Sequence, residues 1–217
     1  MRNNSDLQRD VFDELRWDPA VHSTNIGVTV KDGVVTLAGV VDSYPEKWAA
    51  ERAAKRVSGV MALAEELEVK LSGSGKQTDA DIAEAAENAL KWDVLVPQDR
   101  IKVTVEKGFL TLEGEVDWEF QRSAAKRAVQ YLTGVKGVAN EITIKPSVAP
   151  TDIKAKIEAA LKRNAILDAQ QIKVQADGGK VTLSGSVSSW AERDEAEAAA
   201  WAAPGVTEVK DLIAVTY

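Results

Sequence analysis

The sequence predicts an α+β protein of three tandem αββαβ domains, each a three-stranded mixed sheet with two helices on one face. The first reason is that offsets of 75 and 146 residues superpose residues 5–71, 80–146 and 151–217 without a gap. The second is that the hydrophobic residues of each copy follow helical and strand periods in the order helix, strand, strand, helix, strand. We refer to the copies as the first, second and third repeats.

The repeats share at least thirteen identical columns, and the match is clearest at the centre of each copy. There the sequence reads GVVTLAG at 33–39, GFLTLEG at 108–114 and GKVTLSG at 179–185. Every copy then has a Gly-Val pair twenty residues after the second glycine of this stretch. A gapless match of this length indicates three domains of one fold.

The repeat boundaries predict the domain organisation. We expect domains at 1–71, 80–146 and 151–217. The segment 72–79 is a linker that the Gly and Ser content makes flexible, whereas the linker at 147–150 is short.

Each element of the repeated unit has its own pattern. The first helix is predicted from an apolar residue at every fourth position, which in the first repeat means Leu7, Val11 and Leu15. Two alternating strands follow, joined by a two-residue turn at Asp32-Gly33. The second helix has an alanine-rich stripe, and the third strand is expected to return parallel to the second through a right-handed crossover.

Glycines occupy the same three places in each repeat. One lies in the hairpin turn, where a positive φ is needed, and one lies on the second strand, where we expect it to leave room for the alanine-lined helix. The third is expected to cap the C-terminal end of the second helix. In that order, these structural glycines are Gly33, Gly108 and Gly179; Gly39, Gly114 and Gly185; and Gly59, Gly134 and Gly205.

The strand motif G-x-[VLF]-T-L-x-G-x-V, the Gly-Val pair and the order of elements together resemble the BON domain, a family named after bacterial OsmY and nodulation proteins. The resemblance covers nearly the whole chain, three times. It implies small non-enzymatic modules in stress-responsive envelope proteins, which contact phospholipid surfaces or other macromolecules. Some cytoplasmic members that also contain a LysM module bind potassium, and this sequence has no LysM module.

The composition disfavours several kinds of chemistry. The chain has no Cys and one His, so thiolate catalysis, Cys-bound zinc and His-based relays are not expected. We expect His22 to be a loop residue, and we predict no enzyme activity, no cofactor and no metal site. The net charge of −7 argues against a nucleic-acid partner, and no apolar run is long enough to cross a membrane.

Aromatic and basic side chains on the second helix of each repeat form the candidate binding surface. Aromatic residues stand at its N-terminal end in every copy, and two copies have basic residues along its outer face, which suits an anionic phospholipid surface or a protein partner. Alternatively, the aromatic residues are contacts within or between repeats, and the basic helix of one copy faces the acidic helix of another. The candidate residues are Tyr44, Lys47, Arg52, Lys55, Trp118, Arg122, Lys126 and Trp190.

Other tryptophans have separate expectations. Trp17 and Trp92 hold equivalent positions after the first helix, where the third repeat has Arg163, so we expect them to be half exposed. Trp48 and Trp201 are unique to their copies and are expected to seal contacts between repeats.

A polar residue occurs three times on the core side of the third strand, as Glu65, Asn140 and Asp211. We interpret this column as structural, satisfying a backbone group near the start of the strand.

These observations predict a non-catalytic binding or scaffold protein linked to osmotic or envelope stress, whose three related surfaces gain from multivalency. The alternative is a sensor of a small ligand or cation, with potassium as the specific candidate. The N-terminal residues lack the pattern of a secretion leader, so we expect a cytoplasmic protein, or a periplasmic one if a leader has been removed.

Overall fold

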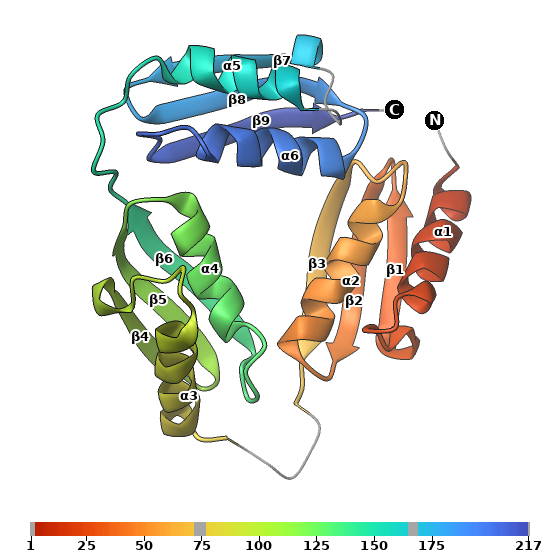
Figure 1. Ribbon diagram of the computed structural model, residues 1–217. Helices are drawn as coiled ribbons and strands as arrows, with labels where there is room; N and C mark the ends of the chain where they lie inside the picture. The colour runs from red at the N-terminus through yellow and green to blue at the C-terminus, as the bar shows by residue number, and fades with distance from the viewer. Residues whose placement is uncertain (1–2, 72–76, 165–168, 217) are drawn as a thin grey trace.

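The computed structural model describes residues 3–71, 77–164 and 169–216, and it contains the αββαβ unit three times (Figure 1). The first repeat consists of α1 (Asn4–Trp17), β1 (Ile26–Lys31), β2 (Val34–Val41), α2 (Tyr44–Arg56) and β3 (Ala62–Val69). The second consists of α3 (Asp79–Trp92), β4 (Ile101–Glu106), β5 (Phe109–Val116), α4 (Glu119–Val129) and β6 (Gly137–Ile144). The third consists of α5 (Ile153–Arg163), β7 (Ile172–Asp177), β8 (Lys180–Val187), α6 (Trp190–Trp201) and β9 (Glu208–Val215).

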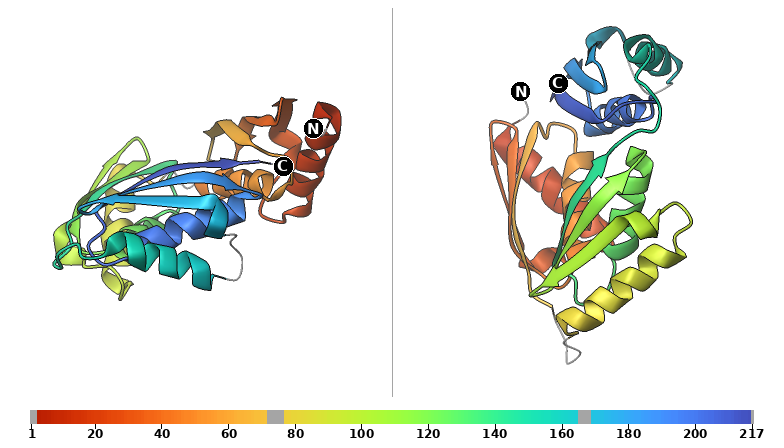
Figure 2. Two further views of the ribbon diagram at one scale, coloured as in Figure 1. Left: turned by 90° about the horizontal axis from the view of Figure 1, so that it is seen from above. Right: turned by 90° about the vertical axis from the view of Figure 1, so that its left-hand side faces the viewer.

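The three sheets have the same topology. In each, the second strand lies in the middle, antiparallel to the first strand and parallel to the third, as in the order β1-β2-β3. Both helices of a repeat cover one face of its sheet (Figures 1 and 2). The predicted fold class, α+β with three mixed sheets, is confirmed.

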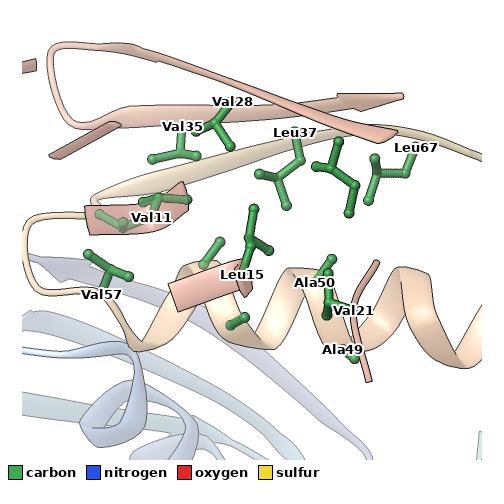
Figure 3. Packing of buried hydrophobic residues seen from close by; sticks show 14 of the residues in the cluster. Val11, Leu15, Val21, Val28, Val35, Leu37, Ala49, Ala50, Val57 and Leu67 are labelled. Atoms are coloured by element: carbon green, nitrogen blue, oxygen red, sulfur yellow. The ribbon is translucent and has the colours of Figure 1, made fainter. Parts of the chain in front are cut away.

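Each repeat has its own hydrophobic cluster, formed between its sheet and its two helices. In the first repeat, Leu7, Val11 and Leu15 of α1 are buried together, as the four-residue spacing predicted. Ala50 and Ala53 of α2 are fully buried under the strands, and the cluster fills the layer between helix and sheet (Figure 3). A unit of this size buries a smaller share of its surface than a large domain does, so contacts with neighbouring units matter for its stability.

The hairpin turn and the Gly-Val turn of each repeat are bonded to each other. Asp32 and Gly33 both have positive φ, at 50° and 79°, as the two-residue turn predicted. The prediction is wrong for Gly179: in the third repeat the positive φ lies at Gly178, and a Cβ on Gly179 would instead clash with the Gly205 carbonyl at 2.6 Å. The carbonyl of Gly33 accepts a hydrogen bond of 2.9 Å from the backbone N–H of Met61, directly after the Gly-Val pair. The same bond recurs from Lys136 to Gly108 and from Thr207 to Gly179. This contact explains why the two glycine motifs occur as a set.

The expected reason for the glycine on the second strand is wrong. A Cβ on Gly39 would clash with the backbone carbonyl of Asn25, the residue just before β1, and its three nearest atoms belong to Asn25 and Ile26 rather than to the alanines of α2. Gly39 also has a φ of 143°, which side chains rarely allow. Gly114 and Gly185 repeat this geometry against the carbonyls of Arg100 and Gln171.

The glycine of the Gly-Val pair is not a helix cap. Helix α2 ends at Arg56 with Val57 as its C-cap, so Gly59 lies beyond the helix, in the turn that leads to β3. Its φ of 101° still requires glycine there. Gly134 and Gly205 lie in the corresponding turns, with φ of 95° and 91°.

Part of the predicted linker 72–79 can be described. Residues 72–76 lie outside the described part of the chain. Thr78 caps α3, which begins at Asp79, and its hydroxyl accepts a hydrogen bond from the N–H of Asp81. No helix in the described ranges is both long enough and apolar enough to span a bilayer.

Replacing Gly39 by Ala is expected to lower the free energy of unfolding by about 2 kcal/mol, because the new methyl group meets the Asn25 carbonyl at an unfavourable φ. The matched control is Gly27→Ala on the paired strand, where a Cβ would lie 3.5 Å from the Ala38 carbonyl, an ordinary contact. Chemical unfolding of both variants checks this. Equal stabilities of G39A and G27A would contradict the steric explanation.

Candidate functional site

The second helices of the three repeats run head to tail around a triangle (Figure 1). Trp190, the first residue of α6, donates a hydrogen bond of 2.8 Å from Nε1 to the Val60 carbonyl of the first repeat. Tyr44, the first residue of α2, packs on the core of the second repeat, with its phenol near the backbone of Val138. Two of the aromatic candidates therefore lie in contacts between repeats.

The third corner of the triangle is the junction between the start of α4 and the end of α6. Trp201, in the last turn of α6, packs against the hydrophobic cluster of the second repeat, as the sequence predicted for this residue. The guanidinium of Arg122 lies 5.5 Å from the centre of the Trp201 ring. Trp48, by contrast, stacks within its own helix, with the Arg52 guanidinium 4.2 Å from its ring centre.

Most of the basic candidates already have partners inside the protein. Lys47 forms an ion pair of 3.0 Å with Glu65 on β3, and Arg122 forms one of 3.0 Å with Glu119. Lys55 pairs with Glu51 at 2.7 Å and also lies 5.0 Å from the ring centre of Trp190 in the third repeat. The remaining candidate, Lys126, is half-buried in the last turn of α4.

The polar column on the third strand is structural, as predicted. Each of Glu65, Asn140 and Asp211 accepts a hydrogen bond from the backbone N–H two residues later on its own strand. Each also bonds to the same position of the second helix, as when Asp211 accepts a bond from Arg193. This column therefore attaches the second helix to the edge strand.

His22, Asp42 and Glu46 form the one group of metal-ligating side chains that lie within 4.8 Å of one another in the described parts of the chain. The buried Glu46 carboxylate accepts hydrogen bonds from the backbone N–H groups of His22 and Asp42, at 2.7 and 2.8 Å. In the second repeat Gln121, a neutral residue, accepts the corresponding bond from Asp117. Bonding of the loop to the helix therefore accounts for Glu46.

Trp17 and Trp92 are far more exposed than expected, each with 83% of its surface accessible. They end α1 and α3, and each follows an exposed basic residue, Arg16 or Lys91. Val94, beside Trp92, is 96% exposed. This exposure could have been predicted from the sequence. The buried face of the helix has an apolar residue at every fourth position up to Leu15, and position 17 does not lie on that face.

Glu119 is a largely buried acid at the junction of α4 and α6. It holds the column occupied by Tyr44 and Trp190 in the other repeats, and its side chain is 17% exposed. Burial raises the pKa of this carboxyl, and the nearby charge of Glu197 raises it further. The hydrogen bond from Ser123 and the charge of Arg122 act in the opposite direction.

The chain is similar to known proteins both at the level of a family and in its sequence. A family model described as BON domain matches residues 3–70, 78–146 and 150–217. The chain is also 34% identical over 129 residues to Osmotically-inducible protein Y of Escherichia coli (strain K12). This alignment covers 58% of this chain and 64% of that protein, so the match spans less than two thirds of the relative's length.

Similar solved structures include two of CdsD, a structural protein of the Type III secretion system of Chlamydia trachomatis. The first is 14% identical, with a TM-score of 0.26, covering 96% of this chain and 91% of that one. The second, of its C-terminal domain, is 13% identical, with a TM-score of 0.28 and full coverage of both chains.

Replacing Glu119 by Gln is expected to raise the free energy of unfolding at neutral pH by about 1 kcal/mol. This is the magnitude of the cost of burying a polar group that is incompletely hydrogen-bonded. Because burial raises the pKa of Glu119, the folded protein is penalised while this carboxyl is ionised. The penalty is full above the raised pKa and disappears as the pH falls through it, so the advantage of E119Q shrinks on acidification. Unfolding curves between neutral and acidic pH check this.

Glu115→Gln is the control for E119Q, because Glu115 lies on β5 with a side chain that is 54% exposed. Its effect should be small, because an exposed ion pair such as that of Glu115 with Lys145 contributes little to stability. If the stability gained by E119Q stays constant as the pH falls, the ionised Glu119 carboxylate does not destabilise the folded protein.

Replacing Trp190 by Phe removes the bond to the Val60 carbonyl while keeping an aromatic ring near Lys55. We expect a loss of about 1 kcal/mol in the free energy of unfolding and faster amide exchange in the turn between α2 and β3. The control is Trp48→Phe, which changes a tryptophan stacked within its own helix. If both variants behave alike, this bond does not hold the first and third repeats together.

Proposed function

The chain belongs to the BON domain family, whose model matches all three repeats, and from this we propose that it is a non-catalytic binding protein of the osmotic stress response that docks on anionic phospholipid surfaces. The name of the Escherichia coli relative, Osmotically-inducible protein Y, supports the link to osmotic stress. The family resemblance supports a non-catalytic role and contact with phospholipid.

The observation that carries the docking proposal is the pair of exposed tryptophans at equivalent helix ends. An amphipathic indole ring is favoured at the boundary between headgroups and hydrocarbon. Trp17 and Trp92 are each 83% exposed and each adjoins a basic side chain. A cation close to an anionic lipid surface contributes about 1 kcal/mol. Each of two repeats thus offers the same small contact, and two linked contacts bind more tightly than either alone.

The side chains on the second helices that the sequence indicated as binding candidates are less available to a lipid surface. Trp190 and Tyr44 contact neighbouring repeats, and Lys55 and Arg122 lie near aromatic rings across the repeat junctions. Their use in holding the repeats together supports assigning the lipid contact to the helix ends. The third repeat has Arg163 in this position and would contribute charge without an inserting ring.

Vesicle flotation tests the proposal. The protein should float with vesicles containing phosphatidylglycerol and bind more weakly to pure phosphatidylcholine. Added salt should reduce the binding, because it screens the basic residues. The fluorescence of the inserted tryptophans should shift to shorter wavelength on binding.

The double variant Trp17→Ala/Trp92→Ala should lose most of this binding, by about tenfold or more, since two interfacial rings are removed. Trp48→Ala is the control and should float like the unmodified protein. If the unmodified protein stays in the soluble fraction with anionic vesicles, phospholipid docking is wrong and a protein partner becomes the better hypothesis.

A further inference from the structure

A cavity of about 680 Å³ lies between α4 of the second repeat and α6 of the third. This volume suits a small organic ligand. Trp118 and Phe120 at the start of α4 and Trp201 at the end of α6 supply aromatic walls. The rings of Trp118 and Phe120 are stacked, with centres 6.4 Å apart and an angle of 28° between their planes.

Negative charge predominates in the lining of this cavity. Glu119 from α4, with Asp194 and Glu197 from α6, contributes three carboxylates. Arg122 is the one basic residue in the lining, and it already pairs with Glu119 at 3.0 Å. The raised pKa of Glu119, caused by burial and by Glu197, is consistent with this excess of negative charge.

The last turn of α6, which lines the cavity, has no basic side chain. The C-terminal end of a helix has a partial negative charge, which basic residues in the last turn usually offset. Every other α-helix in the described parts of the chain has such a residue, for example Lys55 and Arg56 in α2, but α6 has none. Trp201 occupies the position of Lys55, so no basic side chain of α6 offsets the charge of its end, which meets the partial positive charge at the start of α4 across the cavity.

Trp201 is also arranged to receive a cation. Its indole N–H donates to Glu197 at 3.2 Å, which holds the ring beside a carboxylate. Arg122 already lies 5.5 Å from the ring centre, so the ring has one cation beside it in this structure. Aromatic faces next to carboxylates attract cations that have an apolar body and a weakly held hydration shell.

We propose that the cavity between α4 and α6 binds a small organic cation of the alkylammonium class, free in solution. The carboxylates oppose an anion, and a neutral molecule would gain nothing from the charge of Glu197 beside Trp201. A strongly hydrated metal ion would gain little from the aromatic walls. This proposal does not depend on phospholipid docking, because the exposed tryptophans at the ends of α1 and α3 are not part of the cavity lining.

Isothermal titration calorimetry with the full chain tests the proposal, with choline chloride as the probe and ionic strength kept constant with sodium chloride. Choline should bind, whereas its neutral isostere 3,3-dimethylbutan-1-ol and potassium chloride should not bind at the same concentrations. Equal binding of the isostere would overturn the proposal, because charge would then play no part. Binding of phosphatidylcholine vesicles without binding of dissolved choline would also overturn it.

Variants on α6 localise the site. Glu197→Gln should weaken choline binding about tenfold, because one carboxylate near the cation is removed. Glu195→Gln is the matched control on the same helix, since Glu195 bonds to Asn164 outside the cavity lining, and it should bind choline normally. Equal affinities of E197Q and E195Q would overturn the proposed site. Melting curves without choline establish that both variants are folded.

Discussion

The arrangement of this protein depends on the contacts at the ends of α2, α4 and α6. Each αββαβ unit is small, and the start of each second helix packs against the neighbouring repeat around the triangle. These contacts bury aromatic rings that would otherwise lie on the surface, and they add to the limited burial within each unit. They also decide which side chains remain free to meet other molecules.

Two of the junctions between repeats each pair an aromatic ring with a basic side chain. The helix end that supplies the ring in one junction supplies the basic side chain in the other. Between the third and first repeats, the aromatic ring of Trp190 comes from a helix start and the cation, Lys55, from a helix end. Between the second and third repeats, Arg122 lies near the helix start and the ring of Trp201 at the helix end. The exchange places Glu119 where the other repeats have an aromatic residue, and this junction contains the cavity.

The elements of the fold were predictable because hydrophobic spacing reports burial directly. Leu7, Val11 and Leu15 are buried as their spacing indicated, and the polar column at Glu65 bonds to its own strand as expected. The position of Gly39 was correct but its cause was not. Contact with the Asn25 carbonyl depends on strand register and on the turn before β1, which spacing along the chain does not report.

The candidate site was less predictable, because it depends on how the repeats meet. Tyr44 and Trp190 are reasonable surface residues within a single repeat, and only the neighbouring repeat buries them. The exposure of Trp17 and Trp92 could have been anticipated from their phase relative to the apolar stripe. The arginine at the equivalent position of the third repeat predicted their exposure less well, because it led us to expect side chains that are only half exposed.

The bond from Trp190 to Val60 joins residues 130 positions apart in the sequence. When a ribosome synthesises this chain, the first repeat emerges long before the residue that covers its end of α2. The surface around Val60 must therefore stay uncovered until the third repeat leaves the exit tunnel. Closure of the triangle is in this sense a late event of biosynthesis, and a chain interrupted after the second repeat would leave that surface available to other proteins.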